Sequence, residues 1–156
     1  MRTDLSGTNH YQSSSVSSGV TQRGLNLNNI RKYEAAEKKR SGKYNCAQAV
    51  ICTYCDKVGI DEETARELGN AFAVGMGNME GTCGALIGVG IILGLSGKSK
   101  VEAIQGMRRI MNNFQERNGA TQCKLLKGIE SGKVLRECPD CVADACEFLE
   151  EVLDFD

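Results

Sequence analysis

From Ile30 to the end of the chain, apolar residues recur at intervals of three and four positions. This spacing places side chains on one face of an α-helix. No segment alternates apolar and polar residues over several positions, so no β-sheet is expected. The pattern therefore predicts an all-α protein, a compact bundle of about five or six helices.

Capping residues divide this pattern into helices. Asn45, Asp61, Thr82 and Ser99 are residue types that cap helix N-termini, and Pro139 is a favoured first helical residue. The predicted segments are roughly 30–40, 45–57, 61–74, 83–95 and 99–117, then a short turn of helix over 122–126 and a last helix over 139–153.

The segment 83–95 is apolar on almost every side, which is typical of a helix at the centre of a fold. Its glycines come in steps of four, Gly84 with Gly88 and Gly90 with Gly94. Glycine lowers helix propensity but lets a second backbone or a buried group approach closely. We expect tight helix packing along these glycines, with a cofactor groove as the alternative.

Residues 1–29 are rich in Ser, Gly, Asn and Thr and show no helical or strand period. Such a segment cannot bury enough apolar surface to offset the entropy of ordering it, so it is expected to be a disordered, flexible tail. The remaining residues, 30–156, are expected to form a single helical redox domain around the glycine-rich central helix.

Charge is nearly balanced, with Lys+Arg 19 against Asp+Glu 20. No strong overall field attracts phosphate backbones or anionic lipids, so neither nucleic acid nor a membrane is an expected partner. The longest apolar run, 85–95, is shorter than the about 20 residues of a spanning helix, and the first residues lack the apolar stretch of a signal peptide. A cytoplasmic location is therefore expected.

Eight cysteines are present, and in a reducing compartment they bind metal, carry redox chemistry or pack in the core. The single histidine, His10, lies in the predicted tail. A core imidazole is thus absent, which excludes Cys/His and Ser/His/Asp nucleophilic sites, mixed Cys/His zinc sites in the core and Cys-x-x-Cys-His haem attachment.

Two cysteines lie where helices are predicted to begin. Cys83 falls in the first turn of the central helix, where free backbone N–H groups and the positive end of the helix dipole favour a thiolate. Cys138 immediately precedes Pro139, so its sulfur can face the N-terminus of the last helix. Both thiols are expected to be unusually acidic.

Other cysteines give weaker signals. Cys52 and Cys55 lie about 240° and 180° around the helix from Cys46, so they are interpreted as packed thiols rather than a redox or zinc half-site. Cys146 lies in the apolar stripe of the last helix and is interpreted as a core residue. Cys141 ends a Cys-Pro-Asp-Cys sequence similar to that of glutaredoxins, but no strand precedes it, which disfavours a thioredoxin-like domain.

Four segments together resemble the redox-active protein family named for its C_GCAxxG_C_C cysteine pattern. They are 44–50 around Cys46, 81–88 around Cys83, 123–126 beginning with Cys123, and 138–142 beginning with Cys138. The intervals, 83 − 46 = 37, 123 − 83 = 40 and 138 − 123 = 15, are too long for a local metal knuckle. These thiols can meet only through the fold.

The resemblance implies an α-helical redox domain related to the split-Soret cytochromes, whose corresponding cysteines are associated with an iron–sulfur cluster. It implies Cys46, Cys83, Cys123 and Cys138 as the metal and cofactor ligands. Cys141, three residues after Cys138, competes with it for the fourth position. No haem motif is present, so the haem of those relatives does not carry over.

Three functions remain open at this stage. The first is an electron-transfer or redox-sensing protein with an iron–sulfur cluster, two-iron favoured over four-iron. The second is a metal-free thiol–disulfide or peroxide-reducing oxidoreductase, with Cys83 or Cys138 as the redox-active thiolate and Cys141 or Cys46 as the resolving thiol. The third is a structural zinc-binding module. The expected partner is a redox protein, a small thiol or an electron carrier, and a homodimer is an alternative to the monomer.

Overall fold

The computed structural model describes residues 27–154, and the predicted tail lies outside this range up to residue 26. Within residues 27–154 the chain forms seven α-helices and no strand, slightly more helices than expected. Their bounds are α2 (Leu27–Arg40), α3 (Cys46–Tyr54), α4 (Glu62–Gly69), α5 (Gly84–Leu95), α6 (Lys100–Asn118), α7 (Cys123–Lys127) and α8 (Cys138–Val152), with one 3-10 helix, η1 (Cys55–Val58). None of the described helices has both the length and the apolar character to cross a bilayer.

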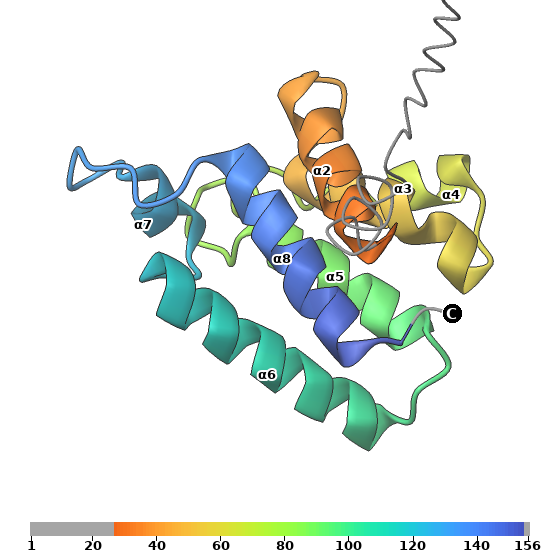
Figure 1. Cartoon of the computed structure of the whole chain (residues 1–156). Helices are drawn as coiled ribbons and strands as arrows, with labels where there is room; N and C mark the ends of the chain where they lie inside the picture. The colour runs from red at the N-terminus through yellow and green to blue at the C-terminus, as the bar shows by residue number, and fades with distance from the viewer. Residues whose placement is uncertain (1–26, 155–156) are drawn as a thin grey trace, which may run out of the picture.

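The central helix is α5, as its apolar sequence predicts. It packs against α3, α6 and α8, while α2 lies along α8 (Figure 1). The largest side chains with less than 2 % exposure come from all of these helices except α2, and they include Ile51, Leu86, Ile92, Phe114 and Leu149. Burial of these apolar surfaces drives the association of the helices.

Two glycines of α5 allow α3 to approach closely. A Cβ atom on Gly88 would lie 2.9 Å from the carbonyl oxygen of Ala47, and one on Gly84 would lie 3.2 Å from Cβ of Cys46. Gly94, in contrast, has nothing within 4 Å. The glycine spacing therefore serves tight packing at the N-terminal half of α5, whereas Gly94 near its C-terminus has no such role.

Most of the predicted caps are present. Asn45 and Ser99 each form a reciprocal capping box, and the Asp61 carboxylate accepts a hydrogen bond from the backbone N–H of Thr64. Thr82 was expected to cap the central helix, and this prediction is wrong. Its backbone forms an isolated antiparallel bridge with Gln122, so Cys83 itself occupies the N-cap position.

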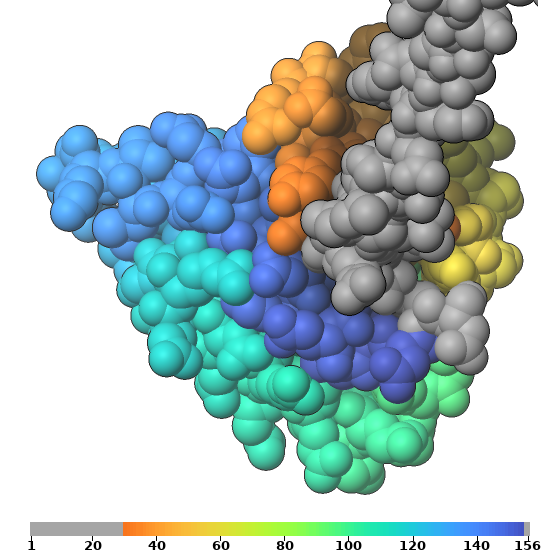
Figure 2. Space-filling view, viewed as in Figure 1, coloured from red at the N-terminus to blue at the C-terminus, as the bar shows by residue number. Residues whose placement is uncertain are grey.

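The third predicted helix is shorter than expected, since α4 ends at Gly69 instead of continuing to about residue 74. The chain then forms a loop in which Val74, Met76 and Met79 adopt positive φ angles. Non-glycine residues rarely adopt this conformation, and no pattern in the sequence predicts it. This loop, with α7 and the segment 128–137, lies at one end of the bundle, and Figure 2 shows the latter segment extending from the body.

Candidate redox centre

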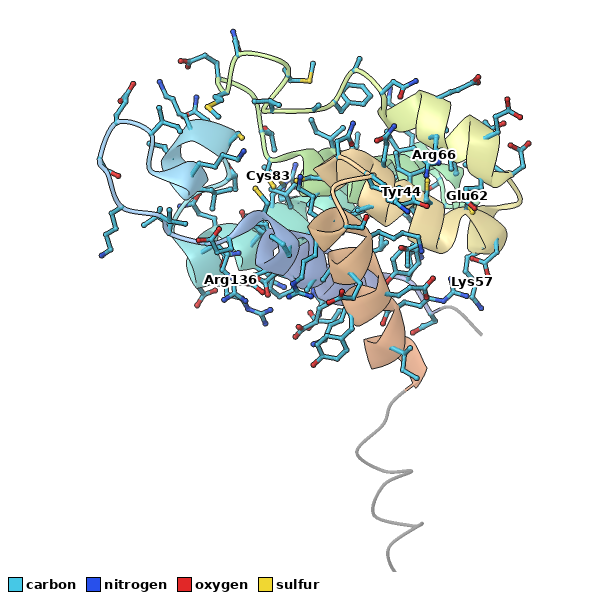
Figure 3. All side chains as sticks on the ribbon, turned by 90° about the horizontal axis from the view of Figure 1, so that it is seen from above. Tyr44, Lys57, Glu62, Arg66, Cys83 and Arg136 are labelled. Atoms are coloured by element: carbon cyan, nitrogen blue, oxygen red, sulfur yellow. The ribbon has the colours of Figure 1, made fainter. Side chains whose placement is uncertain are left out.

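One pocket at this end of the bundle is lined by five cysteines, which come from four separate segments of the chain. It has a cavity volume of about 70 Å³. Each sulfur belongs to the start of a helix: Cys46 begins α3, Cys83 caps α5, Cys123 begins α7, and Cys138 and Cys141 lie in the first turn of α8. Figure 3 shows Cys83 near the junction of these elements.

Gly84 brings the starts of α3 and α5 together. A side chain at this position would lie 2.8 Å from the carbonyl oxygen of Phe72 and 3.2 Å from Cβ of Cys46. Any larger residue would push α3 away from the residue that follows Cys83. Gly84, which follows Cys83, therefore allows the thiols of Cys46 and Cys83 to come close together.

Backbone hydrogen bonds fix Cys123 next to Cys83. The N–H of Cys83 donates to the Thr121 carbonyl at 2.8 Å, and the N–H of Cys123 donates to the Gly81 carbonyl at 3.0 Å. Gly75 packs against Cys123 from the loop, where a Cβ atom would lie 2.5 Å from that of Cys123. Two segments that are remote in sequence thus run side by side into the pocket.

Cys46 and Cys138 form the first of two sulfur pairs. The Cys46 thiol donates a hydrogen bond to the Cys138 sulfur, and this bond lowers the pKa of Cys138 to about 6, with Lys127 and Lys39 adding to the effect. The same bond, together with burial, raises the pKa of Cys46. Near neutral pH the pair therefore holds one thiolate and one thiol.

Cys83 and Cys141 form the second pair. A hydrogen bond from the Cys141 thiol, followed by those from the backbone N–H groups of Ala85 and Leu86, lowers the pKa of Cys83, although burial opposes them. Cys141 in turn has a raised pKa because it donates that bond and is buried. The pKa values of Cys83 and Cys138 are lowered in the expected direction, but N–H groups of a helix start contribute only at Cys83, whereas at Cys138 the Cys46 thiol and two lysines are responsible. Burial raises the pKa of Cys123.

Arg136 and Asp144 hold the wall of the pocket beside Cys141. The Asp144 carboxylate, only 4 % exposed, accepts a hydrogen bond from Nε of Arg136 at 2.9 Å and one from Nη1 of Arg117 at 3.1 Å. The carbonyl oxygen of Arg136 lies 3.7 Å from Sγ of Cys141, as an alternative acceptor for the single proton of that thiol. Asp144 therefore ties the segment before α8 to α6 and α8.

The other three cysteines do not line the pocket. Cys146 is fully buried beside Tyr54, as expected for a core residue, and burial raises its pKa. The Cys55 thiol donates a hydrogen bond to the Cys52 carbonyl at 3.3 Å, and burial raises the pKa of Cys52 to about 11. These thiols are protonated at neutral pH and remote from the pocket lining.

All four predicted ligands, Cys46, Cys83, Cys123 and Cys138, are brought to one pocket, and their role in binding a group stays a prediction. Within residues 27–154 no three cysteine or carboxylate side chains stand ready around a single metal-ion position. Cys141 joins the four as a fifth thiol, and its sequence signals are the Cys-Pro-Asp-Cys motif and its position one helical turn after Cys138. The lining residues Lys39 and Lys127 had no sequence signal, because each belongs to an ordinary charged helix face.

A comparison with protein families matches residues 44–152, more than half of the chain, to the family described as "Putative redox-active protein (C_GCAxxG_C_C)". Searches among curated proteins and among solved structures found no match.

Proposed function

The chain belongs to the C_GCAxxG_C_C family and is a cysteine-based redox protein, and we propose that its thiol pocket holds an iron–sulfur cluster for electron transfer or redox sensing. The observation that carries the proposal is the convergence of five cysteines from four segments on one pocket. Chance packing of small apolar thiols accounts for Cys146 but not for five sulfurs at four helix starts.

The donor set fits such a group. Iron–sulfur clusters are held by four cysteine thiolates, and the ligands are spread over two or more iron atoms, so they need not converge on a single point. Cys46, Cys83 and Cys123 would supply three ligands, and Cys138 or Cys141 the fourth. When bound, the cluster would accept or release one electron.

The chain's own residues provide the surroundings that such a centre requires. The backbone N–H groups of Ala85 and Leu86 donate hydrogen bonds to the Cys83 sulfur, which stabilises negative charge there. Ala73, Val74 and Leu126 supply apolar walls, and the residues Cys83 and Cys123 are each less than 9 % exposed. Low exposure and N–H hydrogen bonds are two factors by which a protein sets a cluster's reduction potential.

A pair of serine variants tests this proposal. The chain is purified without oxygen, and its visible absorption is compared between Cys83→Ser and Cys146→Ser. We expect the first variant to lose the cluster's colour and the second to retain it, because Cys146 is buried in the core beside Tyr54. Full colour in Cys83→Ser, with both variants folded by circular dichroism, would rule out ligation by Cys83.

A second function is supported by the sulfur pairs. In a dithiol oxidoreductase, the Cys138 thiolate attacks a substrate disulfide, forms a mixed disulfide and releases one substrate thiol. Cys46 then loses its proton and attacks Cys138, which forms the Cys46–Cys138 bond and releases the second substrate thiol. The pair loses two electrons and the substrate disulfide gains them.

The proposed functions differ in what the purified protein would contain. A dithiol enzyme would be colourless and would form a reducible disulfide between Cys46 and Cys138, identified by peptide mass spectrometry. A structural zinc module, the third alternative, would be colourless and hold one zinc per chain with no disulfide.

A further inference from the structure

The mouth of the thiol pocket carries positive charge. Lys39 in the last turn of α2 and Lys127 in the last turn of α7 line it from two different elements. The adjacent Lys38 is ion-paired with Glu34, whereas neither Lys39 nor Lys127 has an ion-pair partner among residues 27–154. Apart from their attraction to the Cys138 thiolate, their charges are available to a partner outside the chain.

Exposed apolar side chains adjoin these lysines. Val74 lines the mouth and is 50 % exposed, and Met76 on the same loop is 53 % exposed. Leu125 and Ile129 are exposed on and just after α7, the helix to which this loop is joined by backbone hydrogen bonds. Apolar groups beside unpaired charges are the composition of a protein-binding face rather than of a simple ion site.

Three of the five pocket cysteines are deeply buried, which favours electron exchange over attack from outside at those sulfurs. Cys83, Cys123 and Cys141 are each less than 9 % exposed, whereas Cys46 and Cys138 are partly exposed. A substrate disulfide must bring its sulfur into contact with a thiolate, whereas an electron crosses a short gap without such contact. A carrier that covers the mouth can therefore serve this pocket without entering it.

From these observations we propose that the pocket mouth, with Lys39, Lys127, Val74 and Met76, is the docking face for an electron-carrier protein with an acidic surface. The inference rests on the proposed function, in that the pocket holds a redox centre. One electron leaves the carrier and one enters the centre, and no atom is transferred. Charge complementarity raises the association rate and makes the affinity depend on salt.

Binding of a fluorescently labelled acidic plant-type ferredoxin tests the proposal. The full chain is used both loaded with iron and metal-free, and Kd is measured at low and high ionic strength. The variant Lys39→Glu/Lys127→Glu is expected to raise Kd about tenfold or more at low salt, with a smaller salt dependence. The control Lys98→Glu/Lys100→Glu makes the same change of charge beyond the other end of α5 and is expected to keep Kd within about twofold.

Met76→Asn tests the apolar contribution without disturbing the loop, because asparagine tolerates the positive φ of 64° at this position, and Met76 does not line the pocket. This variant is expected to weaken ferredoxin binding and to leave the reaction rate with ferricyanide, a small anion, unchanged. The docking proposal is wrong if Met76→Asn binds ferredoxin normally while the lysine variant slows the reaction with ferricyanide as much as it weakens ferredoxin binding. That result would show that the mouth attracts anions in general.

Iron analysis of the same samples separates the two proposals. A chain that binds ferredoxin through the lysines but holds no iron contradicts only the proposed cluster. An iron-loaded chain that does not bind ferredoxin, or binds it equally well in both lysine variants, contradicts only the docking face.

Discussion

The Cys141 thiol donates a hydrogen bond to the sulfur of Cys83 and thereby joins the first turn of α8 to the N-terminus of α5. With the matching bond from Cys46 to Cys138, it makes the pocket a set of two thiolate–thiol pairs with Cys123 beside them. The protonation states of these four thiols follow from the two bonds.

The Cys138 thiol is expected to react with iodoacetamide at unusually low pH in the reduced, metal-free chain. Alkylation requires the thiolate, so its rate rises as pH increases through the pKa of about 6 and is constant above neutrality. In Cys46→Ala the hydrogen-bond donor is lost, so the midpoint moves up toward the ordinary value of about 8.5. Quantitative mass spectrometry of the Cys138 peptide measures both profiles, and coincident midpoints would show that Cys46 is not the cause.

Gly84→Ala is expected to destabilise the protein by about 1–3 kcal/mol, because its Cβ would lie 2.8 Å from the Phe72 carbonyl oxygen. The matched change is Gly94→Ala in the same helix, where nothing lies within 4 Å. Alanine there is expected to stabilise by about 0.4–1 kcal/mol through higher helix propensity. Urea unfolding measures the free energy of unfolding of both variants. Changes of the same sign would contradict the role of Gly84 in the close approach of α3 and α5.

Asp144→Ala is expected to destabilise the fold by about 1–3 kcal/mol, since it leaves Arg117 and Arg136 without their shared buried carboxylate. The segment before α8 should also loosen, so that Cys141 reacts faster with a thiol reagent. Asp140→Ala is the control, because its ion pair with Arg40 is exposed and 3.9 Å long. Surface pairs of this kind contribute less than about 1 kcal/mol, so equal losses in the two variants would refute the role of Asp144.

The sequence predicts the helices well wherever their ends depend on local interactions. Asn45 and Ser99 cap their helices through side-chain hydrogen bonds within four residues, which a reader of the sequence can anticipate. Thr82 and the end of α4 were predicted incorrectly because tertiary contacts decide them. Thr82 forms its bridge with Gln122, and the last carbonyl groups of α4 accept hydrogen bonds from the side chains of Asn45 and Gln48; all of these partners are distant in the chain.

The candidate site, like the helices, was predicted only in part. The resemblance to the C_GCAxxG_C_C family supplied Cys46, Cys83, Cys123 and Cys138, and the fold brings them to one pocket. Periodicity alone could not pair the thiols, since the hydrogen bond between Cys83 and Cys141 depends on how α5 and α8 are packed. The positions of Lys39 and Lys127 at the pocket mouth could not be predicted from the sequence either, because a lysine is recognised as a mouth residue only when the pocket is known.

The most direct test of the central claim is the content of iron, zinc and acid-labile sulfide in the chain purified without oxygen. If the pocket holds the proposed cluster, the protein is coloured and contains iron and sulfide in equal amounts, and Cys83→Ser loses both. A colourless, folded chain that contains no iron, with either a disulfide among the pocket cysteines or one bound zinc, would contradict the proposal.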